Sequence, residues 1–303
     1  MKKKVLVTGG NGFIGSEVCK LLLENNYSVI SFDLEKNKLK GVKSNFNGSI
    51  LDPIELAHAI KGCDYVIHLA ASLGVANTEK NRLECLHINI QGTINLLEAC
   101  VKQNIKKVIF ASSSEIYGEQ KIVPIKESAP LNPKSNYAIT KLVGEEYMRA
   151  YFDTHKLKYN ICRFFNIYGP KQKKQFVTSI FINNIKNNKD LTIYGNGKQI
   201  RSFCHVTDAA QGIVKSLKFK KSGEIFNIGN DEEPISILNL AKKIIKISNK
   251  KIKIKKINFS KSDRNEKREI YKRIPDITKA YKALNYRPQI SLDQGLRDML
   301  SKK

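Results

Sequence analysis

Residues 3–15 read Lys-Lys-Val-Leu-Val-Thr-Gly-Gly-Asn-Gly-Phe-Ile-Gly, and this stretch decides the fold. The apolar run at 5–7 is short, rich in β-branched residues and bounded by glycines, which predicts a buried strand. Gly9, Gly12 and Gly15 come after it with the spacing G-x-x-G-x-x-G. Glycines in this pattern permit a tight turn and let backbone N–H groups approach a pyrophosphate at the start of a helix. We therefore expect a strand, a phosphate-binding turn and a helix over residues 16–24.

A second strand, expected over residues 28–32, ends next to Asp33. A carboxylate at the end of the second strand of such a unit accepts hydrogen bonds from a ribose hydroxyl and repels a 2′-phosphate. Strand, glycine turn, helix, strand and acid in this order are the signature of a dinucleotide site. The sequence therefore predicts NAD, rather than NADP, as the cofactor.

The rest of the chain extends this unit into a sheet. Strands and helices alternate through residue 165, which predicts right-handed crossovers and parallel strands. Further strands are expected over 65–69, 107–111 and 159–163, with helices over 93–103 and 136–153. The predicted fold class is α/β: a Rossmann-type doubly wound parallel sheet over 1–169, with some later segments crossing back, and a smaller C-terminal α/β domain over 170–303.

Tyr137 and Lys141 form the pair with the clearest chemistry. They lie four residues apart in an expected helix, so their side chains share one face. An ammonium beside a phenol favours the phenolate and lowers the phenol pKa from its usual value of about 10. The pair therefore predicts a general base that works near neutral pH.

The chain of 303 residues is strongly basic, with 53 Lys and Arg against 28 Asp and Glu and a net charge of +25. The excess is mostly lysine, and aromatic residues make up only 8% of the chain. Arginine forks and stacking aromatics, which read bases, are concentrated nowhere, so we expect a solvated surface and no nucleic-acid partner. The Lys/Ile tract at 242–256 is expected to end in a strand with one solvated lysine face.

Other compositional features exclude further classes. The sequence has no apolar run of about 18 residues or more and no signal peptide, which predicts a cytoplasmic protein with no membrane partner. The six cysteines and five histidines show no metal-like spacing, so no metal is expected. Scattered cysteines of this kind are usually small buried hydrophobes in a reducing compartment. His68, at an expected strand end, is predicted to be a packed, hydrogen-bonded residue that lines the cofactor loop.

Eight segments, taken in order, give the chain a family resemblance that runs nearly from end to end. It resembles the extended short-chain dehydrogenases/reductases, in particular their nucleotide-sugar epimerases, dehydratases and decarboxylases. The segments are Thr-Gly-Gly-Asn-Gly-Phe-Ile-Gly (8–15), His-Leu-Ala-Ala (68–71), Asn-Ile-Gln-Gly-Thr (89–93), Ser-Ser-Ser-Glu-Ile-Tyr-Gly (112–118), Tyr-x-x-x-Lys (137–141), Arg-Phe-Phe-Asn-Ile-Tyr-Gly-Pro (163–170), Ile-Tyr-Gly-Asn-Gly-Lys-Gln-Ile-Arg (193–201) and Phe-Asn-Ile-Gly (226–229).

The resemblance implies a role for each residue of the catalytic set. Ser113 would hydrogen-bond the O4 of a sugar, Tyr137 would take the O4 proton, and Lys141 would bind the nicotinamide ribose. Loss of the C4 hydride to NAD⁺ gives a 4-keto sugar, the intermediate that the whole group shares. In relatives, the helices corresponding to 93–103 and 136–153 pair across a two-fold axis, which implies a homodimer.

The fate of the 4-keto sugar depends on Glu115 and its neighbours, and three functions remain open. A 4-epimerase, with a UDP-sugar as substrate, asks least of the sequence. A UDP-glucuronate decarboxylase or a 4,6-dehydratase would use Glu115; related dehydratases have Asp-Glu where this chain has Ser114-Glu115, and decarboxylases have an arginine like Arg273 in Arg-Ile-Pro-Asp. The third function is a noncatalytic NAD-binding or RNA-binding protein, against which the intact Ser113, Tyr137 and Lys141 argue.

The resemblance also implies the residues that contact each ligand. Those expected around NAD are Gly9, Gly12, Phe13, Ile14, Gly15, Asp33, Ser49, Ile50, Leu69, Ala70, Ala71, Asn89, Tyr137 and Lys141. Those expected around the nucleotide sugar are Ser113, Asn166, Phe176, Val177, Tyr194, Arg201 and Arg264. Ser49 departs from the pattern, because the family usually has an aspartate there to bind the adenine amine.

Overall fold

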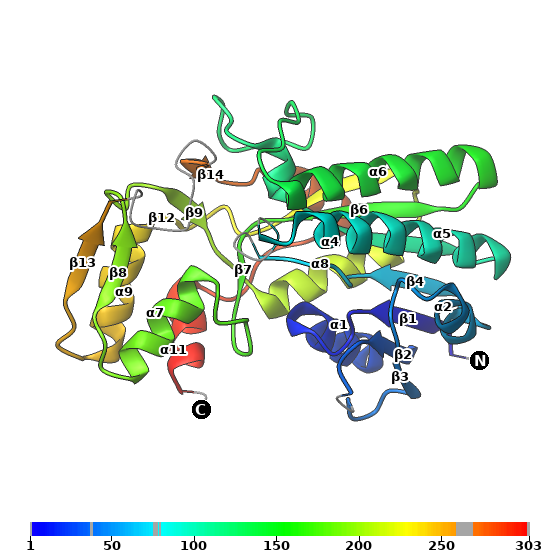
Figure 1. Ribbon diagram of the computed structural model, residues 1–303, viewed down its shortest axis with the longest axis horizontal. Coiled ribbons are helices and arrows are strands. Elements are labelled where there is room, and N and C mark those ends of the chain that lie inside the picture. The colour runs from blue at the N-terminus through cyan, green and yellow to red at the C-terminus, as the bar shows by residue number, and fades with distance from the viewer. Residues whose placement is uncertain (1, 37–38, 75–77, 79, 259–268, 302–303) are drawn as a thin grey trace.

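The computed structural model describes residues 2–36, 39–74, 78, 80–258 and 269–301. Within these residues a seven-stranded parallel sheet has the order β11-β6-β5-β4-β1-β2-β3 (Figure 1). Its strands are β1 (Lys4–Thr8), β2 (Ser28–Asp33), β3 (Ser44–Asn47), β4 (Tyr65–His68), β5 (Lys107–Ser113), β6 (Tyr159–Phe164) and β11 (Glu224–Ile228). The strand order reverses between β1 and β4, and in doubly wound sheets ligands bind at such a switch point.

Helices cover both faces of this sheet. Successive side chains of a strand point to opposite faces, so Val5 and Val7 pack with residues of α1 (Phe13–Glu24) and α8 (Val206–Lys218). Leu6 lies on the other face and packs with residues of α2 (Pro53–Ile60), α5 (Gly92–Lys102) and α6 (Asn136–His155). The central strands β1 and β4 are buried on both faces, which accounts for their apolar runs at 5–7 and 66–67.

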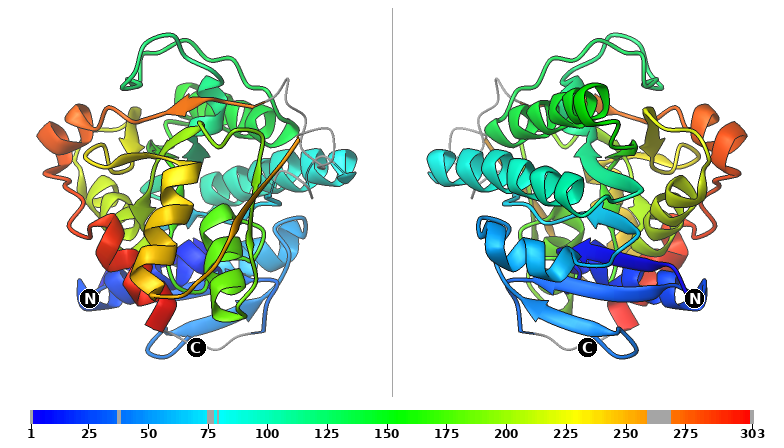
Figure 2. Two further views of the ribbon diagram at one scale, coloured as in Figure 1. Left: turned by 90° about the vertical axis from the view of Figure 1, so that its left-hand side faces the viewer. Right: turned by 90° about the vertical axis from the view of Figure 1, so that its right-hand side faces the viewer.

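A second, smaller layer lies at the C-terminal end of the sheet, and the left view of Figure 2 looks onto it. Its own core joins three helices to a parallel strand pair. These elements are α7 (Val177–Lys186), α9 (Ile237–Ser248), α11 (Leu292–Ser301), β8 (Leu191–Tyr194) and β13 (Ile254–Ile257). The chain returns to the main sheet through α8, β11 and α10 (Thr278–Leu284), as expected for segments that cross back. The domain boundary at residue 170 stays a prediction.

Short elements connect the two layers. A three-stranded sheet has the order β12-β9-β14, and β7 pairs with β10. Their bounds are β7 (Ile167–Tyr168), β9 (Ile200–Ser202), β10 (Cys204–His205), β12 (Pro234–Ser236) and β14 (Lys272–Arg273). Before α5 the chain forms α4 (Arg82–Leu86) and a π-helix (His87–Gln91), and after β5 it forms a 3₁₀ turn (Ser114–Tyr117).

The expected strands and helices of residues 1–165 are confirmed, with one shifted start. The first helix begins at Phe13 rather than at residue 16. Gly12 is extended and precedes the helix. Gly15 lies inside the helix, and it must be a glycine because a Cβ there would collide with the carbonyl oxygen of Gly9. The glycine pattern alone does not reveal which glycine forms the turn and which one permits close packing. The Lys/Ile tract ends in the expected strand, but its lysines do not share one solvated face: Lys255 and Lys256 are both exposed, and consecutive residues of a strand point to opposite faces.

All six cysteines are buried and free, which confirms their prediction as small core residues. Among the described residues, no three histidine, cysteine, aspartate or glutamate side chains gather as a metal site requires. In the same part of the chain, no helix combines the length and the apolar character needed to cross a membrane.

A buried ion pair joins the middle of α6 to β6. Arg163 is 1% exposed and Glu145 is fully buried. The guanidinium donates two parallel hydrogen bonds, Nε to Oε1 at 2.9 Å and Nη2 to Oε2 at 2.6 Å. Ser112 donates to the same carboxylate at 2.6 Å, and Arg163 Nη1 donates to the hydroxyl of Tyr117 at 2.9 Å and to the carbonyl of Glu127 at 3.0 Å. Every charge in this network is therefore hydrogen-bonded.

Replacing Arg163 by methionine is expected to destabilise the protein by about 3–5 kcal/mol, because Glu145 is left charged and buried without its partner. Lys255→Met is the matched control: Lys255 pairs with Asp190 at the surface at 3.0 Å, so its loss is expected to cost about 1 kcal/mol or less. Urea unfolding measures both. The double variant Arg163→Met/Glu145→Leu should recover part of the loss. Equal midpoints for wild type and Arg163→Met would contradict the expectation.

Candidate active site

The glycine turn between β1 and α1 lies at the switch point of the sheet, next to the region outside the carboxyl ends of the strands where doubly wound folds bind ligands, here called the crevice. Gly9 has φ +70°, and a Cβ on it would lie 2.8 Å from the backbone nitrogen of Ala70, which comes after β4. The loops after β1 and β4 therefore approach each other too closely for any side chain. Gly12 has no side chain to cap α1, and the first turn of that helix carries no acid. Its backbone N–H groups and positive helix end suit a pyrophosphate.

Asp33 lies at the end of β2, beside the glycine turn. Its Oδ2 accepts the backbone N–H of Asn11 at 2.9 Å, and its Oδ1 accepts that of Glu35 at 3.0 Å. Two hydrogen bonds fix the carboxylate and leave further lone pairs for hydroxyl donors. This arrangement fits the ribose of a dinucleotide, as the sequence predicts.

Residues expected around the adenine and the nicotinamide lie just after β3 and β4. The Ser49 Oγ accepts the N–H of Leu51 at 3.1 Å, and the Ser49 N–H donates to Glu55 at 2.9 Å. Ile50 is buried, and its side chain fills the space that a Cβ on Gly92 would occupy. Leu69, Ala70 and Ala71 form the loop directly after β4. The residues expected around NAD thus follow the carboxyl ends of β1, β2, β3 and β4, the side on which doubly wound sheets bind dinucleotides.

Ser113, Tyr137 and Lys141 come together at the other side of this crevice. Ser113 ends β5, and both others lie in the first two turns of α6. The Tyr137 phenol forms a hydrogen bond with Ser113. Lys141 is buried, with its Nζ 5.7 Å from the centre of the Tyr137 ring and 5.1 Å from that of Phe110. The predicted i, i+4 pairing on one helix face is confirmed.

The expected lowering of the phenol pKa is wrong for this structure. Burial is the largest effect and raises the pKa of Tyr137; the nearby Glu115 and Cys85 raise it further, while Arg273 and the Ser113 hydrogen bond oppose them. Burial also lowers the pKa of Lys141, to about 8. Helical spacing reveals that the two side chains are neighbours, but it does not reveal how little water reaches them.

Glu115 lies next to this trio and is held by two groups. Its Oε2 accepts the Ser135 hydroxyl at 3.1 Å, and its Oε1 lies 3.5 Å from Nη1 of Arg273. Arg273 Nη2 donates to Oδ1 of Asn166 at 2.6 Å, and the Asn166 amide donates in turn to the carbonyl of Ser202 at 3.1 Å. Arg273 was not among the expected ligand residues, although its Arg-x-Pro-Asp pattern was a signal for it.

Arg201 lies beside Arg273, because β9 and β14 pair with these two residues in register. The side chains of residues paired in this way lie on the same face of a sheet. Nη2 of Arg201 forms an ion pair with Glu269 at 2.9 Å. The structure therefore places Arg201 on the same sheet face as Arg273, whose guanidinium contacts Asn166, and arginine and amide donors of this kind suit a phosphate group. Arg264 lies outside the described residues.

The other residues expected around the substrate lie in the smaller layer. Phe176 precedes α7, which begins at Val177, and Tyr194 ends β8. Gln175 donates to the carbonyl of Leu73 at 3.4 Å, so this segment reaches the loop after β4. Their contact with a nucleobase stays a prediction.

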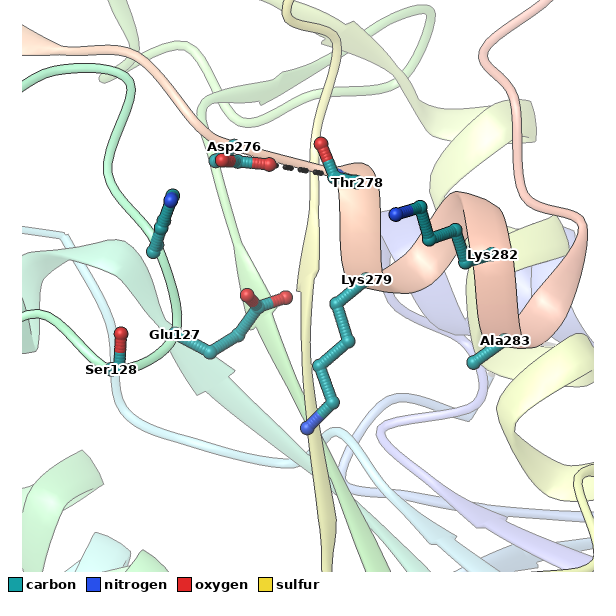
Figure 3. A pocket seen from close by; sticks show the side chains of 8 residues that line it. Glu127, Ser128, Asp276, Thr278, Lys279, Lys282 and Ala283 are labelled. Atoms are coloured by element: carbon teal, nitrogen blue, oxygen red, sulfur yellow. Dashed lines mark hydrogen bonds between the residues drawn. The ribbon is translucent and has the colours of Figure 1, made fainter.

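An open hollow elsewhere on the surface contains none of the predicted site residues. Figure 3 shows Glu127, Asp276, Lys279 and Lys282 around it, with the N–H of Thr278 donating to Asp276 at 2.8 Å. Lys279 also forms an ion pair with Glu224 at 2.8 Å. Most of the residues that line it are charged or polar, and none of them belongs to the predicted catalytic set.

The fold and the glycine turn are those of a protein that binds a dinucleotide, and comparisons with known proteins identify its family. Residues 5–229 match the profile described as the NAD dependent epimerase/dehydratase family. A UDP-N-acetyl-alpha-D-glucosaminuronate decarboxylase of Bacillus cytotoxicus is 36% identical over 99% of this chain and 97% of its own. A UDP-glucuronate 4-epimerase of Thermodesulfobacterium geofontis is 34% identical over 96% and 93%.

A solved structure supports the same assignment. UDP-glucuronic acid 4-epimerase from Bacillus cereus, in complex with UDP-glucuronic acid and NAD, superposes with a TM-score of 0.90 at 33% identity, covering 98% of each chain. The chain belongs to the NAD dependent epimerase/dehydratase family. It is an NAD-dependent enzyme of the nucleotide-sugar epimerase/dehydratase group, which confirms the predicted cofactor and fold class.

Asp33→Ala is expected to narrow the preference for NAD over NADP. The variant loses a hydrogen bond to a charged group, so NAD⁺ affinity should fall about 10- to 100-fold, while NADP⁺ affinity should stay or rise as the repulsion disappears. Isothermal calorimetry with each cofactor measures this. Glu35→Gln, two residues further on, removes the same charge without the ribose contact and should keep the preference. Equal wild-type affinity for both cofactors would overturn the role of Asp33.

Proposed function

We propose that the protein is a 4-epimerase of nucleotide sugars, with a UDP-sugar as its substrate. The observation that carries this proposal is the meeting of Ser113, Tyr137 and Lys141 at the crevice, next to a position 114 that bears no acid. Epimerisation at C4 needs one proton acceptor, one hydride acceptor and room for the sugar to turn. It needs no second acid.

Each residue of the trio has its own part in the reaction. Ser113 binds the sugar O4, and Tyr137 takes its proton as the C4–H bond breaks. NAD⁺, when bound, supplies the hydride acceptor for C4 and a positive charge that favours the phenolate over the phenol. That charge and the Lys141 ammonium oppose the effect of burial on the Tyr137 pKa. Once the 4-keto sugar has rotated, return of the hydride to the opposite face of C4 and of the proton from Tyr137 to O4 would give the epimer, so atoms and charge balance.

The residues before and at Glu115 argue against dehydration. Elimination of water needs an acid to protonate the leaving C6 hydroxyl. Position 114 holds a serine that is 1% exposed, so neither its chemistry nor its place provides that acid. Glu115 is engaged by Ser135 and Arg273, which hold its carboxylate as an acceptor.

Decarboxylation is the second candidate, because Arg273 lies beside Glu115. A guanidinium near the sugar site suits a substrate that carries a carboxylate at C6. The Bacillus cytotoxicus relative, with 36% identity, is named as a decarboxylase. The Bacillus cereus structure, solved with UDP-glucuronic acid and NAD, is a UDP-glucuronic acid 4-epimerase. Incubation of the protein with NAD⁺ and a panel of UDP-sugars and UDP-uronates distinguishes the reactions. An unchanged product mass supports epimerisation, loss of carbon dioxide decarboxylation, and loss of water dehydration.

The diphosphate and the quaternary structure complete the proposal. Arg201, Arg273 and Asn166 would bind the diphosphate, with Phe176, Val177 and Tyr194 around the base. We also propose a homodimer through α5 and α6, which lie side by side in the right view of Figure 2. Ile139 on α6 is 41% exposed, as an apolar residue of an interface would be in a single chain. Light scattering of the purified protein tests this association.

Tyr137→Phe removes the proton acceptor and keeps the ring. Turnover is expected to fall about 10²–10⁴-fold, the usual contribution of a general base. Folding and NAD⁺ binding should persist, as circular dichroism and calorimetry would record. Tyr147→Phe, on the same helix but away from Ser113, is the control and should keep wild-type turnover. Near-normal activity of Tyr137→Phe on the true substrate would contradict the mechanism.

Glu115→Gln separates the two candidate reactions. The amide keeps the shape and part of the hydrogen bonding but cannot act as acid or base. For a 4-epimerase we expect turnover to stay within about tenfold of wild type, because general acid–base catalysis by Glu115, typically about 10²–10⁴-fold, is not used. A decarboxylase or dehydratase should lose that full factor. The steady-state rate, compared with that of the exposed Glu146→Gln control, decides between them.

A further inference from the structure

His68, at the end of β4, joins two threonines from different elements. It is 2% exposed, and its Nδ1 lies 2.8 Å from the hydroxyl of Thr8 at the end of β1. Its Nε2 lies 3.2 Å from the hydroxyl of Thr93 in α5. Both hydroxyls have another partner: Ala70 N–H lies 3.3 Å from the Thr8 oxygen, and the Thr93 hydroxyl lies 2.6 Å from the carbonyl of Asn89.

The direction of each hydrogen bond to His68 follows from the number of protons that the two threonine hydroxyls and the imidazole ring can donate. Thr93 has one hydroxyl proton and donates it to Asn89, since a carbonyl only accepts. His68 must therefore donate to Thr93 from Nε2. In a neutral ring Nδ1 is then an acceptor, so Thr8 donates to it and accepts from Ala70. Burial and the charge of Lys141 lower the pKa of His68 to about 3, which keeps the ring neutral.

A second directed series of bonds starts from the same asparagine. Ser72 N–H donates to Oδ1 of Asn89 at 2.7 Å, and Nδ2 of Asn89 donates to the hydroxyl of Thr140 at 3.0 Å. Thr140 donates its single proton to the carbonyl of Tyr137 at 2.8 Å. Asn89 belongs to the π-helix, a rare element that often marks functional sites. The backbone carbonyl of Asn89 thus accepts the last bond of the series that runs through His68 and Thr93, and its side-chain amide takes part in the series that runs to Thr140.

We propose that His68, as the Nε2–H tautomer, is a positioning residue that sets the catalytic tyrosine relative to the cofactor crevice. The imidazole ring fixes the distance between the crevice wall, which Thr8 and Ala70 form, and the π-helix that carries Asn89. Asn89 in turn holds the backbone of Tyr137 through Thr140. His68 contacts none of the reacting atoms. The inference rests on the proposed role of Tyr137 as the base, and its direct test does not depend on turnover.

Two substitutions separate positioning from packing. His68→Phe keeps an aromatic ring but leaves the proton of Thr8 and the acceptor site of Thr93 without partners. His68→Gln offers an acceptor oxygen and a donor NH₂, so it can restore both bonds. Tyr286→Phe is the matched control, because it removes a buried hydroxyl that donates to Gly229 at 3.1 Å in the core behind the sheet.

The direct test is ¹⁵N NMR of the protein labelled at histidine, with the His68 signals identified from their absence in His68→Gln. We expect the Nε2–H tautomer, unchanged from pH 5 to pH 9 as the pKa of about 3 requires. An Nδ1–H tautomer, or a cationic ring in this range, would overturn the proposal whatever reaction the enzyme catalyses.

The kinetic test uses the same variants and the substrate identified from the panel of UDP-sugars. His68→Phe should lower kcat about 10²-fold, the cost of a displacement of about 1 Å between reacting groups. KM should stay within a few-fold, because Arg201 and Arg273 are untouched. His68→Gln should recover most of the kcat. Equal losses in Phe and Gln variants, no loss in either, or a comparable loss in Tyr286→Phe would reduce His68 to a packing residue and refute positioning.

Discussion

The buried ion pair between Arg163 and Glu145 is the constraint on which the rest of the structure depends. Two charges out of water cost several kcal/mol each unless their geometry satisfies every hydrogen bond, and this network does so. Each partner belongs to a segment that carries part of the site: Glu145 lies one turn after Lys141, Ser112 precedes Ser113, and Arg163 leads β6 toward Asn166. The hydrogen bonds of this pair therefore hold these three segments together.

The sequence predicted the fold well because its signals were local. Apolar strands, the glycine turn and Asp33 lie within a single β–α–β unit, where hydrophobic periodicity and backbone sterics act over a few residues. The same holds for Tyr137 and Lys141, which one helical turn brings together. The prediction for His68 also succeeded from a local signal, because its place at a strand end indicated a packed, hydrogen-bonded residue next to the cofactor loop. The structure confirms that it is buried and bonded through both ring nitrogens.

Other parts of the site depended on contacts that no local pattern encodes. The pairing of β9 with β14 brings Arg201 beside Arg273, although a long stretch of chain separates them, and it also places Arg273 against Glu115. The prediction of a lowered Tyr137 pKa was wrong for a related reason. The spacing of Tyr137 and Lys141 fixes their Coulomb interaction, but the desolvation that outweighs it comes from many residues packed around the phenol. Proximity could be predicted, and burial could not.

One site can serve several reactions because their shared and distinct steps use different residues. In the proposed mechanism Ser113 and Tyr137 act on O4 and Lys141 supports them; all three lie on β5 and α6, which the central ion pair joins. Position 114, Glu115 and Arg273 lie on a 3₁₀ turn and on a short strand of a peripheral sheet. We expect a change there to alter what happens at C5 and C6 without disturbing the oxidation at C4. On the proposed function, the choice of reaction would rest on the Glu115–Arg273 contact, where a sugar carboxylate and Glu115 would compete for one guanidinium.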